Sequence, residues 1–254
     1  MRVLNLSHLT IDERVSKMKK VYLVSFSGGK DSTAMLLKLI DKGYPIDEII
    51  CCDTGKEFDE MYEHIKQVEN NIDIPITHLK SEKSFDYYMF EHRKCRGKNM
   101  DKIGNSWPDF RIRWCTDRLK QNVINKYIRT KYPKKEYEVY QYIGIALDER
   151  KRADKVKDEK HLHPLITWRM TEKDCLQYCY SKGYHWSGLY EKFDRLSCWC
   201  CPLKNLKELR VLYHDFPDKW EELKDMDRRT YRKFRPDYSV EELEEKFKRE
   251  DDEV

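Results

Sequence analysis

Two adjacent glycines followed by lysine, aspartate and serine form the stretch of this sequence with the clearest chemical meaning. The stretch VSFSGGKDSTAML lies between a β-rich run and a run with helical spacing. The backbone N–H groups of Gly28 and Gly29 can approach an anion closely, and the N-terminus of the following helix favours negative charge. Hydroxyl and ammonium donors come from three neighbours: Ser27, Lys30 and Ser32. We therefore predict a phosphate-binding loop, although its spacing differs from the G-x-x-x-x-G-K-[ST] pattern of P-loops.

Asp31 is the unusual member of this loop, because a carboxylate repels phosphate unless a divalent cation lies between them. Its presence favours a nucleotide bound with Mg²⁺, or close pairing with a lysine. The alternative is an ordinary Gly-Gly turn with an N-capping serine. Because six specific residues coincide with a strand-to-helix junction, we interpret the loop as a nucleotide site and expect Lys30 and Asp31 to have catalytic roles.

A second cluster of reactive side chains lies near the C-terminal end, where Cys198, Cys200 and Cys201 fall within four residues. Cys198 and Cys201 have C-x-x-C spacing, which lets two thiolates meet one metal ion or cluster, and Trp199 can shield such a centre from water. The alternative is a set of buried thiols. Cys175 and Cys179 share a helix face and are expected in the core.

Composition limits the classes of protein to consider. The chain has 254 residues, 39% hydrophobic and 38% charged, with a formal net charge of +4 and nine cysteines. No apolar run reaches the 18 residues of a membrane span, and residues 1–20 lack the apolar core of a signal peptide. We therefore expect a cytoplasmic protein without membrane contact, in which cysteines serve metal binding, catalysis or burial rather than disulfides.

Strands and helices must position these residues. Helical and strand-like patterns alternate along the first part of the chain: strands at 19–27, 47–55 and 74–81, helices at 34–42 and 58–71. Such alternation predicts an α/β fold, with an open, mainly parallel twisted sheet and helices on both faces. We expect a nucleotide-binding domain at 1–165 and a helical, cysteine-containing region at 166–254.

The rest of the chain contains further expected elements. A long loop rich in Gly, Pro and Asn covers 85–114, followed by a helix at 116–130 and a strand at 138–147. Thr171 and Asp174 form a Thr-x-x-Asp capping pattern for a helix that Gly183 ends. The segment 148–160 is expected to be a solvated helix or loop, and the tail 239–254 a charged helix.

These motifs, taken in order, resemble the phosphoadenylylsulfate (PAPS) reductase-like family of the adenine-nucleotide α-hydrolase superfamily. SFSGGKDSTAML resembles its pyrophosphate loop, and CCDTGKEFDEMYEHI, RWCTDRLK, GIALDERKRA and GLYEKFDRLSCWCCPL resemble its later segments. The resemblance covers residues 21 to about 203. It includes the ATP pyrophosphatase of DNA phosphorothioate modification, which carries a similar Cys-Trp-x-Cys.

The resemblance implies further nucleotide contacts. Asp53 and Thr54 lie at the carboxyl end of the second strand and are expected to face the nucleotide, with Asp53 having a catalytic role. The alternative is that Asp53 caps the next helix. Gly144 belongs to the Gly-x-x-x-Asp-Glu segment and is expected at the same site. Arg113 is a candidate phosphate clamp, although charged loop residues are usually solvated.

The resemblance also implies a metal centre, in which Cys115 joins Cys198 and Cys201. Iron–sulfur members of the family hold a [4Fe-4S] cluster with cysteines at these two places. The sequence departs from the sulfate-assimilating members by having Thr116 in place of a second adjacent cysteine. Cys200 is the candidate fourth ligand, and the alternative is that three ligands leave one iron open. Zinc accepts the same thiolates and is the alternative.

The reaction expected from the resemblance depends on one absence. PAPS and APS reductases carry a nucleophilic cysteine in a C-terminal Glu-Cys-Gly motif, and no cysteine follows Cys201 here. We therefore predict an ATP pyrophosphatase that adenylates a substrate for sulfur transfer, with sulfonucleotide reduction as the alternative. A nonenzymatic nucleotide- and metal-binding sensor or partner subunit is the third hypothesis.

The expected partners are ATP, a nucleic acid or nucleotide substrate, and a sulfur-donor protein. The stretch DRRTYRKFRPDY interleaves basic and aromatic side chains and suits phosphate contacts and base stacking. The alternative is a solvated helix face balanced by the acidic tail.

Overall fold

The structure is a computed structural model that describes residues 18–95, 97, 100–155 and 158–253. The expectation that residues 1–20 lack a signal peptide falls largely on residues 1–17, which lie outside the described residues. Residues 96, 98 and 99 of the predicted loop also lie outside them. None of the helices in the described part of the chain is long and apolar enough to cross a membrane.

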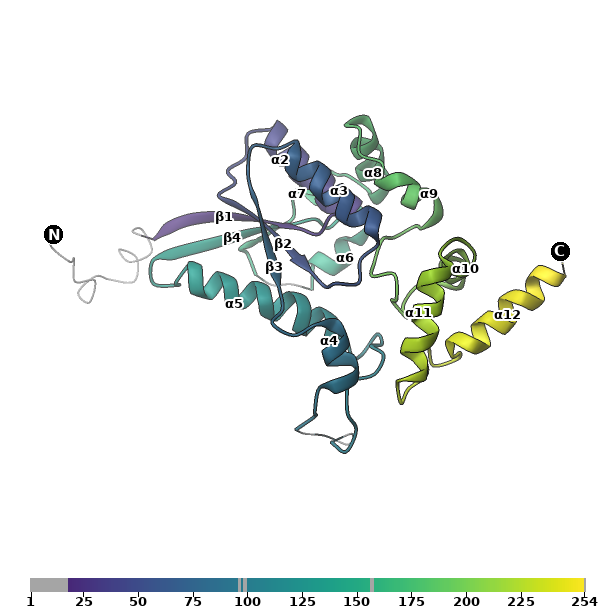
Figure 1. The fold of residues 1–254 in the computed structure, drawn as a ribbon. Helices are drawn as coiled ribbons and strands as arrows, with labels where there is room; N and C mark the ends of the chain where they lie inside the picture. The colour runs from purple at the N-terminus through teal and green to yellow at the C-terminus, as the bar shows by residue number, and fades with distance from the viewer. Residues whose placement is uncertain (1–17, 96, 98–99, 156–157, 254) are drawn as a thin grey trace. The chain divides into compact units, whose positions relative to one another are not determined.

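Five strands form one open sheet in the order β3-β2-β1-β4-β5. Their bounds are β1 Lys19–Phe26, β2 Glu48–Asp53, β3 Ile76–Lys80, β4 Tyr137–Ile143 and β5 His161–Leu162. β1 pairs in parallel with both β2 and β4, and β4 pairs in parallel with β5. Figure 1 shows α2 and α5 on opposite faces of this sheet. The predicted α/β class with a parallel sheet is confirmed.

Helices occupy most of the remaining described chain. The α-helices are α2 Lys30–Asp41, α3 Asp59–Asn70, α4 Trp114–Thr116, α5 Asn122–Lys131, α6 Arg150–Ala153, α7 Pro164–Thr167, α8 Glu172–Ser181, α9 Leu189–Lys192, α10 Leu206–Asp215, α11 Pro217–Arg228 and α12 Val240–Asp252. Short 3₁₀ turns lie at Leu147–Glu149 and Trp186–Gly188, and π-helical turns at Tyr87–Glu91 and Asp117–Gln121. The helix predicted at 116–130 is therefore interrupted by a π-helical turn, which sequence periodicity did not reveal.

Local sequence explains several helix ends. Thr171 and Asp174 form the predicted capping box at the start of α8. Gly43 and Gly183 follow α2 and α8 with φ of 64° and 84°, the left-handed region in which glycine carries no Cβ penalty. The tail forms the expected charged helix, α12, capped by Ser239.

The chain divides into two compact units, each built from separate segments. Unit 1 holds Met1–Cys51, Glu69–His78 and Ile124–Gly183, of which residues 18 onward are described, and unit 2 holds Cys52–Val68, Leu79–Val123 and Tyr184–Val254. The proposed division at residue 165 stays a prediction.

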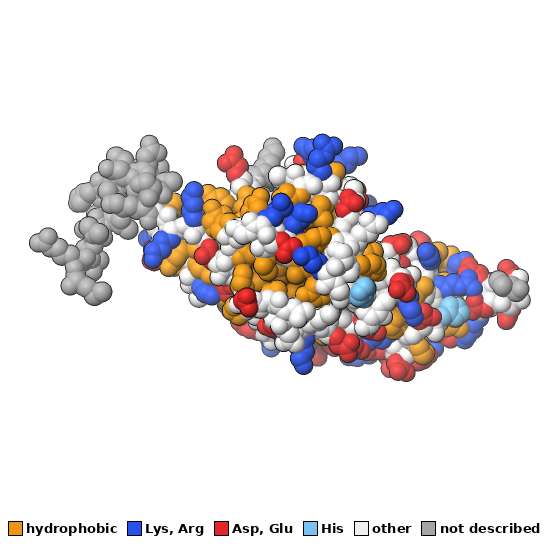
Figure 2. Space-filling view, turned by 90° about the horizontal axis from the view of Figure 1, so that it is seen from above, with side chains coloured by type: hydrophobic (Ala, Val, Ile, Leu, Met, Phe, Trp, Pro, Cys, Tyr) orange, Lys and Arg blue, Asp and Glu red, His pale blue; other side chains and the backbone are white. Residues whose placement is uncertain are grey.

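The core of unit 1 is aliphatic. Leu23 and Val24 of β1 and Leu36 and Leu39 of α2 have no exposed surface, and neither does Ile49 of β2. β-branched and leucine side chains fit a parallel sheet that is covered by helices. Figure 2 shows apolar side chains gathered in the middle of one molecular face, with basic and acidic side chains interspersed around them.

Unit 2 has an aromatic core. Its largest fully buried side chains are Phe58, Trp107, Trp186, Phe193, Trp220, Phe234 and Phe247. Several of these rings contact one another, as in the pair of Trp107 and Phe234, with ring centroids 4.9 Å apart. Aromatic rings bury large areas, which suits a unit that has no sheet of its own to pack against.

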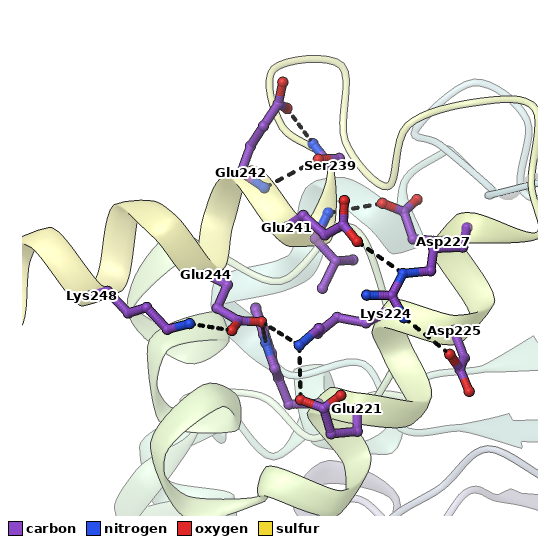
Figure 3. A network of polar contacts seen from close by, with 12 residues as sticks. Glu221, Lys224, Asp225, Asp227, Ser239, Glu241, Glu242, Glu244 and Lys248 are labelled. Carbon is purple, nitrogen blue, oxygen red and sulfur yellow. Dashed lines mark hydrogen bonds and ion pairs between the residues drawn. The ribbon is translucent and has the colours of Figure 1, made fainter.

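Ion pairs connect α11 to α12 in unit 2. Lys224 lies between Glu221 and Glu244 at 2.9 and 2.8 Å, and Arg228 donates to Glu241 at 2.8 Å (Figure 3). The acidic side chains of the tail thus neutralise basic side chains of the helix before it.

Candidate functional site

The glycine loop of unit 1 lies where the order of the strands reverses. β1 has β2 on one side and β4 on the other, and Ser25 at the end of β1 is in register with Ile143 at the end of β4. Open parallel sheets bind ligands at the carboxyl ends of strands flanking such a switch point. Ser27 follows β1 directly and Gly144 follows β4 directly, so both lie at this point.

The loop has a defined backbone shape. Gly28 has φ of 77°, and Gly29 is the N-cap residue of α2. The N-cap residue Gly29 has no side chain, so no serine hydroxyl caps α2 from the N-cap position. This differs from the alternative of a Gly-Gly turn with an N-capping serine. Ser32 Oγ donates to the Gly29 carbonyl at 3.0 Å and lies 3.1 Å from Ser27 Oγ. The two serine hydroxyls hold the ends of the loop together.

Gly144 is needed because the loop backbone approaches it closely. A Cβ atom at this position would lie 2.9 Å from both Cα and N of Ser32 and 3.1 Å from the carbonyl carbon of Asp31. All three atoms belong to the backbone, so any larger side chain must displace the start of α2. The glycine that the family resemblance marks is thus part of the loop's supporting wall.

Lys30 is more deeply buried than expected of a phosphate ligand. Its side chain is 6% exposed, and its ammonium lies 2.5 Å from the Glu172 carboxylate at the start of α8. Behind the loop, Cys175 and Cys179 have no exposed surface, as predicted for core residues. Burial and the negative charge of Asp31 raise the pKa of both thiols. No sequence motif marks Glu172, so it was not predicted as a site residue.

Unit 2 contains the residues that follow β2. Asp53 accepts hydrogen bonds from the Gly55 N–H at 2.7 Å and the Tyr62 hydroxyl at 2.8 Å, and pairs with Lys80 at 3.0 Å. Although burial opposes ionisation, these donors lower the pKa of Asp53. Asp53 therefore closes the turn at Gly55 and does not cap α3, which begins at Asp59.

Thr54 connects the second strand to the cysteine segment. Its hydroxyl donates to Glu57 at 2.9 Å and lies 3.5 Å from Cys198 Sγ, which is also 3.8 Å from the Glu57 carboxylate. Lys120 lies 3.5 Å from the same carboxylate. Although burial opposes its charge, Glu57 raises the pKa of Lys120. Lys120 is thus an ion-pair partner of Glu57.

Lys56 joins the same two segments from the other side. Its carbonyl accepts the Trp199 N–H at 3.0 Å, and its ammonium pairs with Glu222 at 2.9 Å and Asp86 at 3.1 Å. The ammonium also lies 5.4 Å from the Trp199 ring centroid. Trp199 is 4% exposed, and its role in shielding a metal centre stays a prediction.

The four cysteines predicted as metal ligands all belong to unit 2. Cys200 is buried, and Cys115, Cys198 and Cys201 are half-buried. Burial raises the pKa of Cys115, Cys198 and Cys200, and the charge of Cys201 raises each of them further. The Cys201 N–H donates to the Cys198 carbonyl at 3.1 Å, and the four thiols have the donor chemistry of a thiolate centre. Within the described residues, however, no three such side chains are arranged as a metal-binding group.

Lys204 is a buried cation beside these cysteines that the sequence did not single out. It is 2% exposed, its Nζ has no hydrogen-bond acceptor, and it lies 4.6 Å from the Phe193 ring centroid and 5.4 Å from that of Phe58. Burial lowers the pKa of Lys204. Only the tertiary structure reveals it, because Lys204 lies in an ordinary polar stretch of sequence.

A cleft of about 520 Å³ adjoins the cysteine segment in unit 2. Residues 107–110, 202–203 and 232–237 line it. Arg235 donates to the carbonyls of Pro202 and Lys204, and Arg232 donates to the Trp107 carbonyl and pairs with Asp109. These guanidinium groups are engaged by the protein, so the cleft presents mainly apolar surface.

The predicted arginine and basic–aromatic features differ in their surroundings. Arg113 is exposed, and its charge lowers the pKa of neighbouring Cys115, whose overall shift is upward because of burial. In the stretch at 227–238, Arg228 pairs with Glu241 and Lys233 with Glu242. These contacts match the alternative of a helix face balanced by the acidic tail.

Comparisons with known proteins identify one family through its sequence model. The family model described as phosphoadenosine phosphosulfate reductase domain matches residues 21–204. Two uncharacterized proteins of Methanocaldococcus jannaschii are 29% identical over 222 residues and 28% identical over 207 residues, covering 83% and 77% of this chain. The chain spans 42% and 46% of the lengths of those relatives. Among solved structures, the phosphoadenylyl-sulfate reductase from Candida auris in its phosphate complex has a TM-score of 0.47 and 13% identity, covering 76% of this chain and 89% of that one.

Proposed function

The chain belongs to the phosphoadenosine phosphosulfate reductase domain family, and on that premise we propose that it is an ATP pyrophosphatase that adenylates a substrate for sulfur transfer. The observation that carries this proposal is the glycine loop at the switch point, built against Gly144. Its shape suits close approach of a phosphate chain to backbone N–H groups.

Each loop residue has a role in this reaction. Gly28 and Gly29 bring the backbone to the departing pyrophosphate, and the hydroxyls of Ser27 and Ser32 flank it. Lys30 supplies positive charge from a buried position. Asp31 fits the pattern of a Mg²⁺ site completed by substrate phosphates, which needs only one or two carboxylates from the protein. Bound Mg²⁺ would neutralise phosphate charge.

The proposed reaction has two steps, each of which forms one bond and breaks one. In the first, a substrate oxygen attacks the α-phosphorus of ATP, the bond from that phosphorus to the α–β bridging oxygen breaks, and the electron pair leaves with pyrophosphate. In the second, a sulfur nucleophile attacks the substrate carbon that carries the adenylated oxygen, the carbon–oxygen bond breaks, and AMP leaves with the electron pair. The protein contributes positioning and charge neutralisation and forms no covalent bond itself.

The test is the identity of the phosphate product. We expect pyrophosphate, with orthophosphate detected only after inorganic pyrophosphatase is added. Asp31→Ala and Gly29→Val should abolish turnover at an unchanged melting temperature. Asp41→Asn is the matched control, because Asp41 lies at the other end of α2 and pairs with Lys182 at 2.7 Å. Orthophosphate as the direct product would contradict the proposal.

We further propose that the adenylated substrate is a nucleic acid or nucleotide and that a partner protein donates the sulfur. A thiolate centre at Cys115, Cys198 and Cys201, with Cys200 as fourth ligand, would serve that second step. Its expected form is [4Fe-4S], with zinc as the alternative, and iron, sulfide and zinc analysis of anaerobically purified protein decides between them.

Sulfonucleotide reduction is the second candidate, favoured by the family to which the chain belongs. Within these 254 residues no cysteine follows Cys201, so this sequence offers no downstream thiol to carry sulfite. The purified protein should therefore release no sulfite from PAPS or APS with thioredoxin. Robust sulfite release would reverse the order of the two candidates.

A further inference from the structure

Lys30 and Glu172 form a part-buried ion pair between residues that are 142 positions apart in the chain. The Lys30 side chain is 6% exposed and that of Glu172 is 33% exposed, with 2.5 Å between the Lys30 Nζ and Glu172 Oε2 atoms. A buried ammonium is unfavourable unless a counter-charge accompanies it. The carboxylate therefore supports the burial of this lysine within the glycine loop.

Glu172 is itself fixed in place. It is the first residue of α8 and lies within the capping box that Thr171 and Asp174 form. Its backbone N–H lies 3.2 Å from both carboxylate oxygens of Asp148, in the 3₁₀ turn that follows β4. The carboxylate that meets Lys30 thus projects from a helix terminus held on two sides.

Three further contacts hold α8 and the residue after it against α2. The Cys179 thiol donates to the Lys30 carbonyl at 3.4 Å, near the start of α2. At the other end of α2, the Tyr178 hydroxyl donates to Asp41 at 2.5 Å and Lys182 pairs with the same carboxylate. Because α8 is attached near both ends of α2, the Glu172 carboxylate cannot move away from the loop without disturbing both helices.

We propose that Glu172 is a positioning residue, which holds the Lys30 ammonium in the orientation that meets the phosphates of bound ATP. An ammonium has three N–H donors, so a lysine can bond to a carboxylate and to phosphate oxygens at the same time. A lysine whose rotamer is fixed in advance loses less conformational entropy on binding. This inference rests on the proposed function and assigns it a residue outside the glycine loop.

The test is a double-mutant cycle on the affinity for ATP in the presence of Mg²⁺, measured by isothermal titration calorimetry. We expect Glu172→Ala to weaken binding roughly tenfold or more, as for loss of a charge-assisted contact, and Glu172→Gln to weaken it less. Lys30→Ala should weaken binding at least as much as Glu172→Ala. The double variant should match Lys30→Ala alone, because Glu172 acts only through Lys30.

Asp41→Asn is the matched control, since it removes an α2–α8 contact at the far end of the same helices. It should leave the affinity unchanged. Equal weakening by Asp41→Asn and Glu172→Ala would assign the effect to helix packing and overturn the inference. Additive effects of Lys30→Ala and Glu172→Ala would also overturn it.

A second measurement distinguishes the positioning role of Glu172 from a loss of stability in the variants. Reductive methylation followed by mass spectrometry should find Lys30 protected in the wild type and more reactive in Glu172→Gln at an unchanged melting temperature. Equal protection in both proteins would contradict the positioning role. Normal ATP affinity in Glu172→Ala would overturn this inference alone, whereas failure of the wild type to bind ATP would overturn the proposed function as well.

Discussion

The glycine loop of unit 1 and the cysteine segment of unit 2 differ in how far each site is formed. The loop has its shape already, because Gly28, Gly29 and Gly144 set it through the backbone. The four cysteines all belong to unit 2, but no three described side chains form a metal-binding group. A site made from backbone is fixed by the fold, whereas a site made from thiols needs its metal to organise it.

The largest effect should come from the cysteines. Cys198→Ser or Cys201→Ser should remove the metal completely and lower the stability of unit 2, because thiolate ligation couples metal binding to folding. Metal analysis by mass spectrometry and thermal melting would measure both. Cys175→Ser and Cys179→Ser are the controls, as both thiols are buried in unit 1. Full metal content in a Cys115→Ser, Cys198→Ser double variant would refute the shared centre.

The second largest effect is expected at Gly144, which lies against the backbone of the glycine loop. Gly144→Ala should lower the affinity for ATP with Mg²⁺ more than roughly 100-fold, because the added Cβ meets the Ser32 backbone at 2.9 Å. Gly43→Ala is the control at the other end of α2: its Cβ meets nothing within 4 Å, but its φ of 64° is strained. That variant should lose stability and keep its affinity. Normal ATP affinity in Gly144→Ala would show that the shape of the loop does not depend on a glycine at this position.

A smaller effect is expected at Glu48, which supports the sheet of unit 1. It accepts hydrogen bonds from Thr77 at 2.6 Å, Lys131 at 2.8 Å and Tyr132 at 2.6 Å, and also from Tyr127. Glu48→Gln should lower the free energy of unfolding by about 2 kcal/mol, through lost charge-assisted hydrogen bonds. Glu69→Gln, at an exposed pair with His78, should change it little.

The same carboxylate predicts a pH dependence. Burial opposes ionisation of Glu48, but its four donors lower its pKa from 4.5 to about 2. A lowered pKa in the folded state gives stability that is complete above pH 4.5 and is lost as the pH falls toward 2. Urea denaturation across this range should show the loss in the wild type and a flatter profile in Glu48→Gln. Identical profiles would contradict the assignment.

The smallest effect is expected in the basic–aromatic stretch. Arg228→Gln and Lys233→Gln should change the free energy of unfolding by less than about 0.5 kcal/mol, because both side chains form exposed pairs with α12. Nucleic-acid affinity, measured by fluorescence anisotropy, should also stay unchanged. A marked loss of affinity in either variant would show that this stretch contacts nucleic acid and exchanges its acidic partners for phosphates.

Features that depend only on residues close together in the chain could be predicted from the sequence alone. The alternation of strands and helices, the glycine loop, and the capping box of Thr171 and Asp174 all follow from local backbone preferences and side-chain spacing. The core placement of Cys175 and Cys179 followed from their shared helix face. Each of these needs only a few consecutive residues, so periodicity and turn chemistry are sufficient to find it.

Contacts between residues far apart in the sequence could be identified only from the tertiary structure. Glu172 reaches Lys30 across 142 positions, Thr54 reaches Cys198 across 144, and neither pair has a sequence motif that links its members. The buried position of Lys204 between two aromatic rings was equally hidden. Such contacts depend on how separate helices and strands pack, and a lysine or glutamate carries the same local signal whether it is solvated or buried beside its partner.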